Sequence, residues 1–383
     1  MRICIDARPI INRHTGLGRY TYNTINALKK IDQENEYLIL TDAKLDPNHP
    51  VFDLKNDCFV YKKCSIPGVT VQQQFKLNQF LKDEKIDVYH YPHFDLPISV
   101  SKRYKSVFTV HDLTYLLHRG IFQGAEYLKK WYTRKILSLG IRYAEKIITV
   151  SNSTKNDLVD YFQMNGSTVA KVETIYEACE SNFVPIKNEK LIENFKQKWN
   201  LNKPYFLFIG ERRPHKNLVR QIEAFDQFLK QLYDGFDFII IGKSYNNYFE
   251  PEEKTKQLNL EGKVRFVGYV EDSEIPMFYN CATAFMFVSL YEGFGLPLLD
   301  AMSCGTAIIT SNISATNEIA ADAAVKVDPY DVEAICKAMH KIVKDKVFKN
   351  DLIQKANLRK QHFSWLKTAE QTLALYEQVH KNL

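Results

Sequence analysis

Short apolar runs typical of strands alternate with longer stretches of helical period along the whole chain. The runs of the first half are 3–5, 37–40, 88–91, 107–110, 147–150 and 172–175. Those of the second half are 205–209, 236–241, 264–267, 284–288, 307–310 and 324–327. Strands that alternate with helices form a parallel sheet with helices on both faces, and 383 residues are more than one typical domain holds. We therefore predict an α/β fold of two Rossmann-like domains that face each other across a cleft.

The region between the two halves gives the domain boundary. Residues 180–204 are rich in Asn, Lys and Glu, a composition typical of a linker. We place the first domain at 1–185 and the second at 186–360. Residues 361–383 carry apolar side chains at helical spacing and form a C-terminal helix.

The composition is that of a soluble globular chain. No apolar run approaches the roughly 20 residues of a membrane-spanning helix, and the start is too polar for a secretion signal. The seven cysteines are scattered without a Cys-x-x-Cys pair, so we expect reduced thiols in a cytoplasmic protein and neither a zinc site nor a disulfide framework.

Positive charge is concentrated in one segment. Between Lys102 and Lys146 there are ten Lys or Arg and three acids, while the whole chain has a net charge of +6. Such a segment is either an ordinary solvated helix face or a surface for nucleic acid, anionic lipid or a phosphate-bearing substrate.

Two acids and several glycines follow the run 284–288. Glu292 opens the sequence Glu-Gly-Phe-Gly-Leu-Pro-Leu-Leu-Asp, which ends at Asp300. Pro297 suits the first turn of a helix, and the glycines before it let the backbone approach a ligand closely. Helix N-termini that follow strands bind anions. The alternative is a surface acid followed by a plain turn.

Cations follow the run 205–209 in the sequence Gly-Glu-Arg-Arg-Pro-His-Lys-Asn. Arg212, Arg213 and Lys216 are suited to a diphosphate, because Arg engages two oxygens at once and Lys supplies a point charge. A cation before a helix opposes the macrodipole, which makes a purely structural role less attractive.

Two further loops carry candidate residues. Gly16 and Gly18 lie between the first strand and a helix, but Thr21 stands where a dinucleotide-binding loop has its third glycine. His111 follows the run 107–110. The common alternative for a lone histidine is a buried, hydrogen-bonded side chain.

Together these segments resemble the signature of family 4 retaining glycosyltransferases with the GT-B fold. The resemblance implies that Glu292 contacts the donor sugar and that Asp300 holds the ribose, although the family usually has Glu where this chain has Asp300. It further implies that Lys216 neutralises the leaving nucleoside diphosphate with Arg212 or Arg213 as partner, of which we choose Arg212 as catalytic and Arg213 as donor-binding. The resemblance places His111 near the 6-position of the sugar. The other residues implied at the donor are Gly16, Gly18, Tyr269, Val270, Gly293, Phe294, Gly295 and Leu296.

The same resemblance implies an activity. The first domain lies on the acceptor side, the second binds the nucleotide-sugar, and the C-terminal helix returns to the first. We predict a retaining hexosyltransferase that transfers mannose from GDP-mannose to a saccharide or polyprenyl-diphosphate-linked acceptor in polysaccharide or lipopolysaccharide synthesis. The alternatives are a UDP-sugar donor, a sugar-nucleotide epimerase or hydrolase of the same fold, and a non-catalytic partner subunit.

The remaining expectations concern cofactors and location. The chain has no Asp-x-Asp motif, and Arg and Lys stabilise the departing phosphate, so we expect neither a metal nor another cofactor. We expect a cytoplasmic enzyme in peripheral contact with anionic lipid at the inner face of a membrane, and no nucleic-acid partner.

Overall fold

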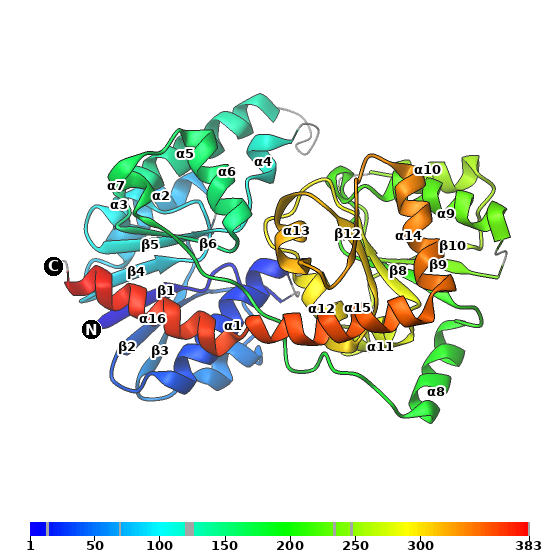
Figure 1. Cartoon of the computed structure of the whole chain (residues 1–383). Helices are drawn as coiled ribbons and strands as arrows, with labels where there is room; N and C mark the ends of the chain where they lie inside the picture. The colour runs from blue at the N-terminus through cyan, green and yellow to red at the C-terminus, as the bar shows by residue number, and fades with distance from the viewer. Residues whose placement is uncertain (13–14, 69, 119–125, 233–234, 246–247, 382–383) are drawn as a thin grey trace. The chain divides into compact units, whose positions relative to one another are not determined.

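The computed structural model describes residues 1–12, 15–68, 70–118, 126–232, 235–245 and 248–381. These residues form two compact units. Unit 1 consists of 1–178 and 363–383, and unit 2 of 179–362. Each unit has its own parallel sheet, so the prediction of two Rossmann-like α/β domains is confirmed (Figure 1).

The sheet of unit 1 has the strand order β3-β2-β1-β4-β5-β6-β7, and every pair is parallel. Its strands are β1 (Arg2–Asp6), β2 (Glu36–Asp42), β3 (Phe59–Cys64), β4 (Val88–Tyr91), β5 (Lys105–Val110), β6 (Lys146–Thr149) and β7 (Val172–Thr174). The run that the sequence analysis did not recognise is β3. It lies at the edge of the sheet and is only partly buried, so it lacks the continuous apolar run of a central parallel strand.

Helices cover both faces of this sheet and give unit 1 two cores. Alternate residues of β1 point to opposite faces, because the side-chain period of a strand is two. Ile3 and Ile5 join the core under α1 and α16, while Cys4 joins the core on the other face. The helices of the unit are α1 (Gly16–Ile31), η1 (Pro50–Leu54), α2 (Val71–Phe80), α3 (Ile98–Ser101), α4 (Thr114–Leu117), α5 (Glu126–Tyr143), α6 (Asn152–Phe162), α7 (Gly166–Val169) and α16 (Trp365–Lys381).

The last helix, α16, packs on α1 and on the sheet of unit 1. The Tyr376 hydroxyl lies 2.5 Å from Nδ1 of His90, and the Thr368 hydroxyl donates to the carbonyl of Tyr176 at 2.6 Å. His90 and Tyr376 are both buried. Unit 2 is therefore inserted between β7 and the helix that completes unit 1. The contacts divide the chain after Ala178, somewhat earlier than the sequence-based boundary at 185.

Unit 2 has the strand order β10-β9-β8-β11-β12-β13, again parallel throughout. Its strands are β8 (Tyr205–Ile209), β9 (Asp237–Ile241), β10 (Val264–Gly268), β11 (Ala284–Phe287), β12 (Ile308–Ser311) and β13 (Val325–Val327). Its helices are α8 (Glu189–Trp199), η2 (Pro214–Lys216), α9 (Leu218–Leu232), α10 (Glu250–Gln257), α11 (Ile275–Cys281), α12 (Leu296–Cys304), α13 (Ser314–Ala320), α14 (Val332–Lys344), α15 (Lys346–Arg359) and η3 (Lys360–His362). The seven cysteines, all within the described residues, form no disulfide. None of the described helices has the length and apolar character needed to span a membrane.

Replacing Tyr376 by Phe removes the hydroxyl that pairs with His90 in the interior. An unpaired buried polar atom costs roughly 1–3 kcal/mol, so we expect the opening free energy of α16 to fall by that amount. Hydrogen exchange of α16 peptides measures this change separately from unit 2. Tyr127→Phe is the control, because Tyr127 is 80% exposed. Equal protection of α16 in Tyr376→Phe and in wild type would contradict the expected role of the bond.

Candidate active site

Lys216 and Glu292 form an ion pair at the carboxyl edge of the sheet in unit 2. Lys216 lies in the loop after β8 and Glu292 in the loop after β11, and these strands are neighbours in the sheet. Nζ of Lys216 lies 2.6 Å from Oε1 of Glu292, and the two side chains are 15% and 11% exposed. The structure thus brings together the two residues that the sequence analysis placed at the sugar and the diphosphate.

Backbone contacts fix the two loops against each other. The amide of Leu290 donates to the carbonyl of His215 at 2.7 Å. Asn217 has a left-handed backbone with φ of 59°, and its Nδ2 donates to the carbonyls of Val288 and Pro329. Gly and Asn tolerate the αL conformation best, so Asn217 can end the 3₁₀ turn that contains Lys216. Its side chain joins the two loops.

The helix α12 begins directly after the glycines that follow Glu292. Gly295 is its N-cap, with φ of 103°, and a Cβ there would lie 3.2 Å from Cδ1 of Leu298. Gly293, Phe294 and Leu296 are buried. The segment therefore presents a helix N-terminus at the same edge as the ion pair, where the macrodipole favours an anion.

Asp300 is only 2% exposed on α12, one to two turns after the glycines. Its Oδ1 lies 3.2 Å from Sγ of Cys179, whose thiol donates to the carboxylate. Cys179 is the first residue of unit 2. In the structure the Asp300 carboxylate therefore already has a partner within the protein. Its predicted contact with the ribose stays a prediction.

The two arginines before Lys216 have different surroundings. Arg212 is 7% exposed, and its guanidinium donates to the carbonyl of Gly242 at 2.7 Å and pairs with Glu252 at 2.8 Å. Arg213 is more exposed and pairs with Glu211 at 2.6 Å. The choice of Arg212 as partner of Lys216 stays a prediction, because the contacts shown by the structure tie Arg212 to the loop after β9 and to the first turn of α10.

Close packing between the loops after β8 and β9 explains one glycine near Arg212. A Cβ on Gly242 would lie 2.0 Å from the carbonyl oxygen of Gly210, closer than any side chain permits. Farther along this edge, Tyr269 follows β10 and is 57% exposed, with Nζ of Lys243 5.5 Å from its ring, whereas Val270 is buried. Tyr269 and Val270 therefore lie at the carboxyl edge of the sheet. Their contact with the base of the nucleotide stays a prediction.

In unit 1, Gly16 and Gly18 lie in the first turn of α1. The Thr15 hydroxyl caps the helix by accepting from the amide of Gly18 at 3.0 Å. Gly16 is exposed, and apart from its chain neighbours and its own helix backbone no described atom lies within 4 Å of the position of a Cβ, while a Cβ on Gly18 would lie 3.0 Å from Oγ1 of Thr15. The loop after β1 therefore ends in an accessible helix N-terminus.

His111 follows β5 and uses both ring nitrogens within unit 1. Nδ1 lies 3.0 Å from Oε1 of Glu177, and Nε2 lies 3.0 Å from the carbonyl oxygen of Pro92. The ring of Tyr20 meets the imidazole edge-on, with centroids 4.7 Å apart. The His111 side chain is 21% exposed.

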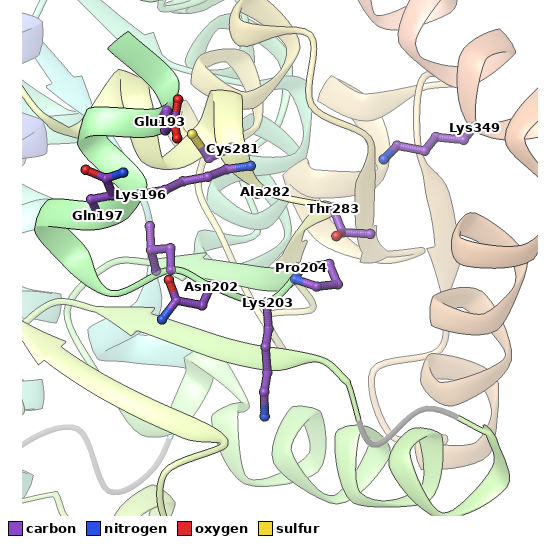
Figure 2. Close-up of a pocket in the computed structure, with 11 residues that line it drawn as sticks. Glu193, Lys196, Gln197, Asn202, Lys203, Pro204, Cys281, Ala282, Thr283 and Lys349 are labelled. Atoms are coloured by element: carbon purple, nitrogen blue, oxygen red, sulfur yellow. The ribbon is translucent and has the colours of Figure 1, made fainter. Parts of the chain in front are cut away.

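A separate cavity of about 600 Å³ lies in unit 2 beside the amino ends of β8 and β11. Figure 2 shows Lys349 extending toward Thr283 and Lys196 extending toward Ala282. Because these strands are parallel, their amino ends lie at the edge opposite to Lys216 and Glu292. Lys196 is in the last turn of α8, where a cation stabilises the helix dipole. The cavity contains none of the predicted site residues.

Several residues with contacts at these loops were not recognised from sequence. Glu177 follows β7 and binds His111, and the position of an acid just past a strand was the available signal. Ser314, whose hydroxyl accepts from the amide of Glu292 at 3.2 Å, follows β12 in the same way. Cys179 gave no signal, since a thiol beside a carboxylate requires knowledge of the fold.

Solved structures share this fold over the full chain. Sucrose-phosphate synthase from Thermosynechococcus elongatus superimposes with a TM-score of 0.79 at 18% identity and with complete coverage of both chains. Anabaena HepE in complex with UDP-glucose gives a TM-score of 0.76 at 15% identity, again with complete coverage of both. The fold is that of the GT-B glycosyltransferases.

Family matches cover most of the sequence. Residues 14–179 match Glycosyltransferase Family 4, and residues 189–359 match Glycosyl transferases group 1. An Escherichia coli protein named O-antigen chain mannosyltransferase B is 26% identical over 396 residues, which cover 98% of this chain and 100% of the relative. The chain belongs to the family 4 glycosyltransferases and resembles bacterial mannosyltransferases.

Arg212→Met is expected to destabilise unit 2, because it leaves the partly buried Glu252 without its partner. We expect a loss of roughly 2 kcal/mol, measured by hydrogen exchange of β8 and β9 peptides. Arg213→Met breaks a more exposed pair and should cost less than about 1 kcal/mol. Equal protection in both variants would show that the Arg212 contacts contribute little to stability.

Proposed function

We propose that this glycosyltransferase transfers mannose from GDP-mannose, with retention of configuration and without a metal ion. The acceptor is a saccharide or a polyprenyl-diphosphate-linked saccharide in surface polysaccharide synthesis. The observation that supports the proposal is the Lys216–Glu292 pair beside the N-terminus of α12, which combines a cation, a carboxylate and a helix dipole at one edge. The donor sugar is inferred from the mannosyltransferase name of the relative that covers the whole chain.

Each half of the ion pair has a separate task in this proposal. Glu292 accepts hydrogen bonds from hydroxyls of the donor sugar, and Lys216 turns to the diphosphate as negative charge develops there. The N-terminus of α12 adds backbone N–H groups and dipole to the same charge. Arg212 joins Lys216 by exchanging its contact with Glu252 for a phosphate oxygen.

In the proposed reaction the acceptor attacks the sugar on the same face from which the leaving group departs. The acceptor hydroxyl forms the new bond to the anomeric carbon while the bond to the diphosphate breaks, and a diphosphate oxygen takes the hydroxyl proton. Lys216 and Arg212 supply the charge that a divalent cation supplies elsewhere. The chain contributes mainly orientation and electrostatic stabilisation.

Glu292→Gln and Lys216→Met should each lower the transfer rate at least about tenfold, because each removes an interaction that is strongest in the transition state. Product formation is measured with GDP-mannose and, in parallel, UDP-sugars. The controls are Glu333→Gln and Lys337→Met, which break an exposed pair on α14. Full activity in either site variant would refute the assignment, and faster transfer from a UDP-sugar would refute the donor. Product from the donor alone would indicate an epimerase or hydrolase.

A membrane contact of unit 1 is the second part of the proposal. On α5, Tyr127, Leu128 and Trp131 are 80%, 64% and 57% exposed. Arg134 and Lys135 are exposed one to two turns farther along the helix. Aromatic residues beside cations on one helix face bind the interface of an anionic membrane. Of the ten basic residues between Lys102 and Lys146, Arg119 lies outside the described residues.

Trp131→Ser should reduce binding to vesicles that contain anionic phospholipid, because it removes an exposed aromatic anchor from α5. We expect at least about a threefold loss of bound protein in flotation at low salt. Val347→Ser is the control, since Val347 is 82% exposed on α15 of unit 2. Equal binding of wild type to neutral and anionic vesicles would contradict the proposed contact.

A further inference from the structure

The two hydrogen-bond partners of the His111 ring are both acceptors. Oε1 of Glu177 lies 3.0 Å from Nδ1, and the carbonyl oxygen of Pro92 lies 3.0 Å from Nε2. A neutral imidazole carries a proton on only one nitrogen, while an imidazolium carries one on each. A neutral ring facing an ionised Glu177 would therefore direct a lone pair at one of the two acceptors.

The surroundings of the ring leave Glu177 as the acid that faces it among the described residues. Glu177 is 4% exposed. Burial, and secondarily the positive charge of His111, lower the pKa of His90 and of His93 to about 3, so both are neutral. Burial raises the pKa of Tyr20, which meets the ring edge-on and also stays neutral.

Asp112, next to His111 in the chain, is engaged elsewhere. Its Oδ1 accepts from the amide of Thr114 at 2.8 Å. The pair of His111 and Glu177 is therefore a cation and an anion held together in a half-buried place, with neutral neighbours. Charge-assisted hydrogen bonds of this kind are stronger than neutral ones.

We propose that Glu177 is a positioning residue that keeps His111 in the doubly protonated form, so that His111 gives the site a fixed positive charge. This inference rests on the proposed function, in which His111 lies at the donor. Neither ring nitrogen then has a lone pair to take a proton from the acceptor hydroxyl. His111 acts by charge and not as a general base, in agreement with a reaction in which the diphosphate takes that proton.

The substitution Glu177→Gln separates charge from geometry. A Gln amide can donate to Nδ1 while the neutral ring keeps the Nε2 proton on the carbonyl of Pro92, so all hydrogen bonds survive. The matched control is Glu173→Gln, which removes a carboxylate paired with Lys146 on β7 of the same unit.

The first measurement is the protonation state of His111 in ¹⁵N-histidine-labelled protein. At about pH 7.5, where an ordinary histidine is mostly neutral, the signal missing from His111→Asn should show two protonated nitrogens in wild type and in Glu173→Gln. It should show one in Glu177→Gln. One unprotonated nitrogen in wild type would overturn the proposal, and this result does not depend on which reaction the enzyme catalyses.

The second measurement is the rate of transfer. In Glu177→Gln we expect kcat to fall at least about tenfold with a change in the donor KM of less than about threefold, whereas Glu173→Gln keeps the wild-type rate. The double variant His111→Asn with Glu177→Gln should be no slower than His111→Asn alone, because Glu177 acts through His111. An additive loss in the double variant, or a wild-type kcat in Glu177→Gln, would overturn the proposal. A wild type that transfers no sugar from any nucleotide would refute the proposed function and leave the protonation result standing.

Discussion

The ion pair between Lys216 and Glu292 is the contact that unites the candidate site of unit 2. Its geometry follows from strand order, because β8 and β11 have β9 and β10 between them in sequence but are neighbours in the sheet. Their loops leave the sheet at the same edge, and Asn217 joins them through the carbonyl of Val288. The two side chains are largely buried, and charge interactions there are stronger than in water. The opposite charges neutralise each other, and under the proposed function a substrate with both hydroxyls and phosphates offers each one a new partner.

Much of the fold was predictable because buried parallel strands are continuous apolar runs. This signal identified the central strands of both sheets and the alternation with helices. It failed at β3, where one side of the strand has no neighbour in the sheet and where Lys62 and Lys63 interrupt the apolar pattern. Periodicity reports burial, so elements with little burial escape it.

The candidate site was predictable to a different extent. Loops after strands gave the positions of Glu292 and Lys216, since a parallel sheet collects its functional loops at one edge. Sequence did not show which of two adjacent arginines is turned inward, because that depends on the carbonyl of Gly242 and on Glu252, 40 residues farther along the chain. It also missed Glu177, whose importance depends on the pairing of β5, β6 and β7 that brings its loop to His111. Partners from distant segments are a property of topology, and residue spacing does not contain them.

The insertion of unit 2 between β7 and α16 has a consequence for synthesis of the protein on the ribosome. All strands of unit 1 emerge first, yet the core above β1 and β4 stays open until α16 follows from the other end of the chain. Unit 2 has no such missing piece, since 179–362 is continuous. The order of completion is therefore reversed relative to the usual rule that N-terminal domains finish first. The contact between His90 and Tyr376 can form only after α16 has been made. Unit 1, whose strands are made first, is therefore completed last.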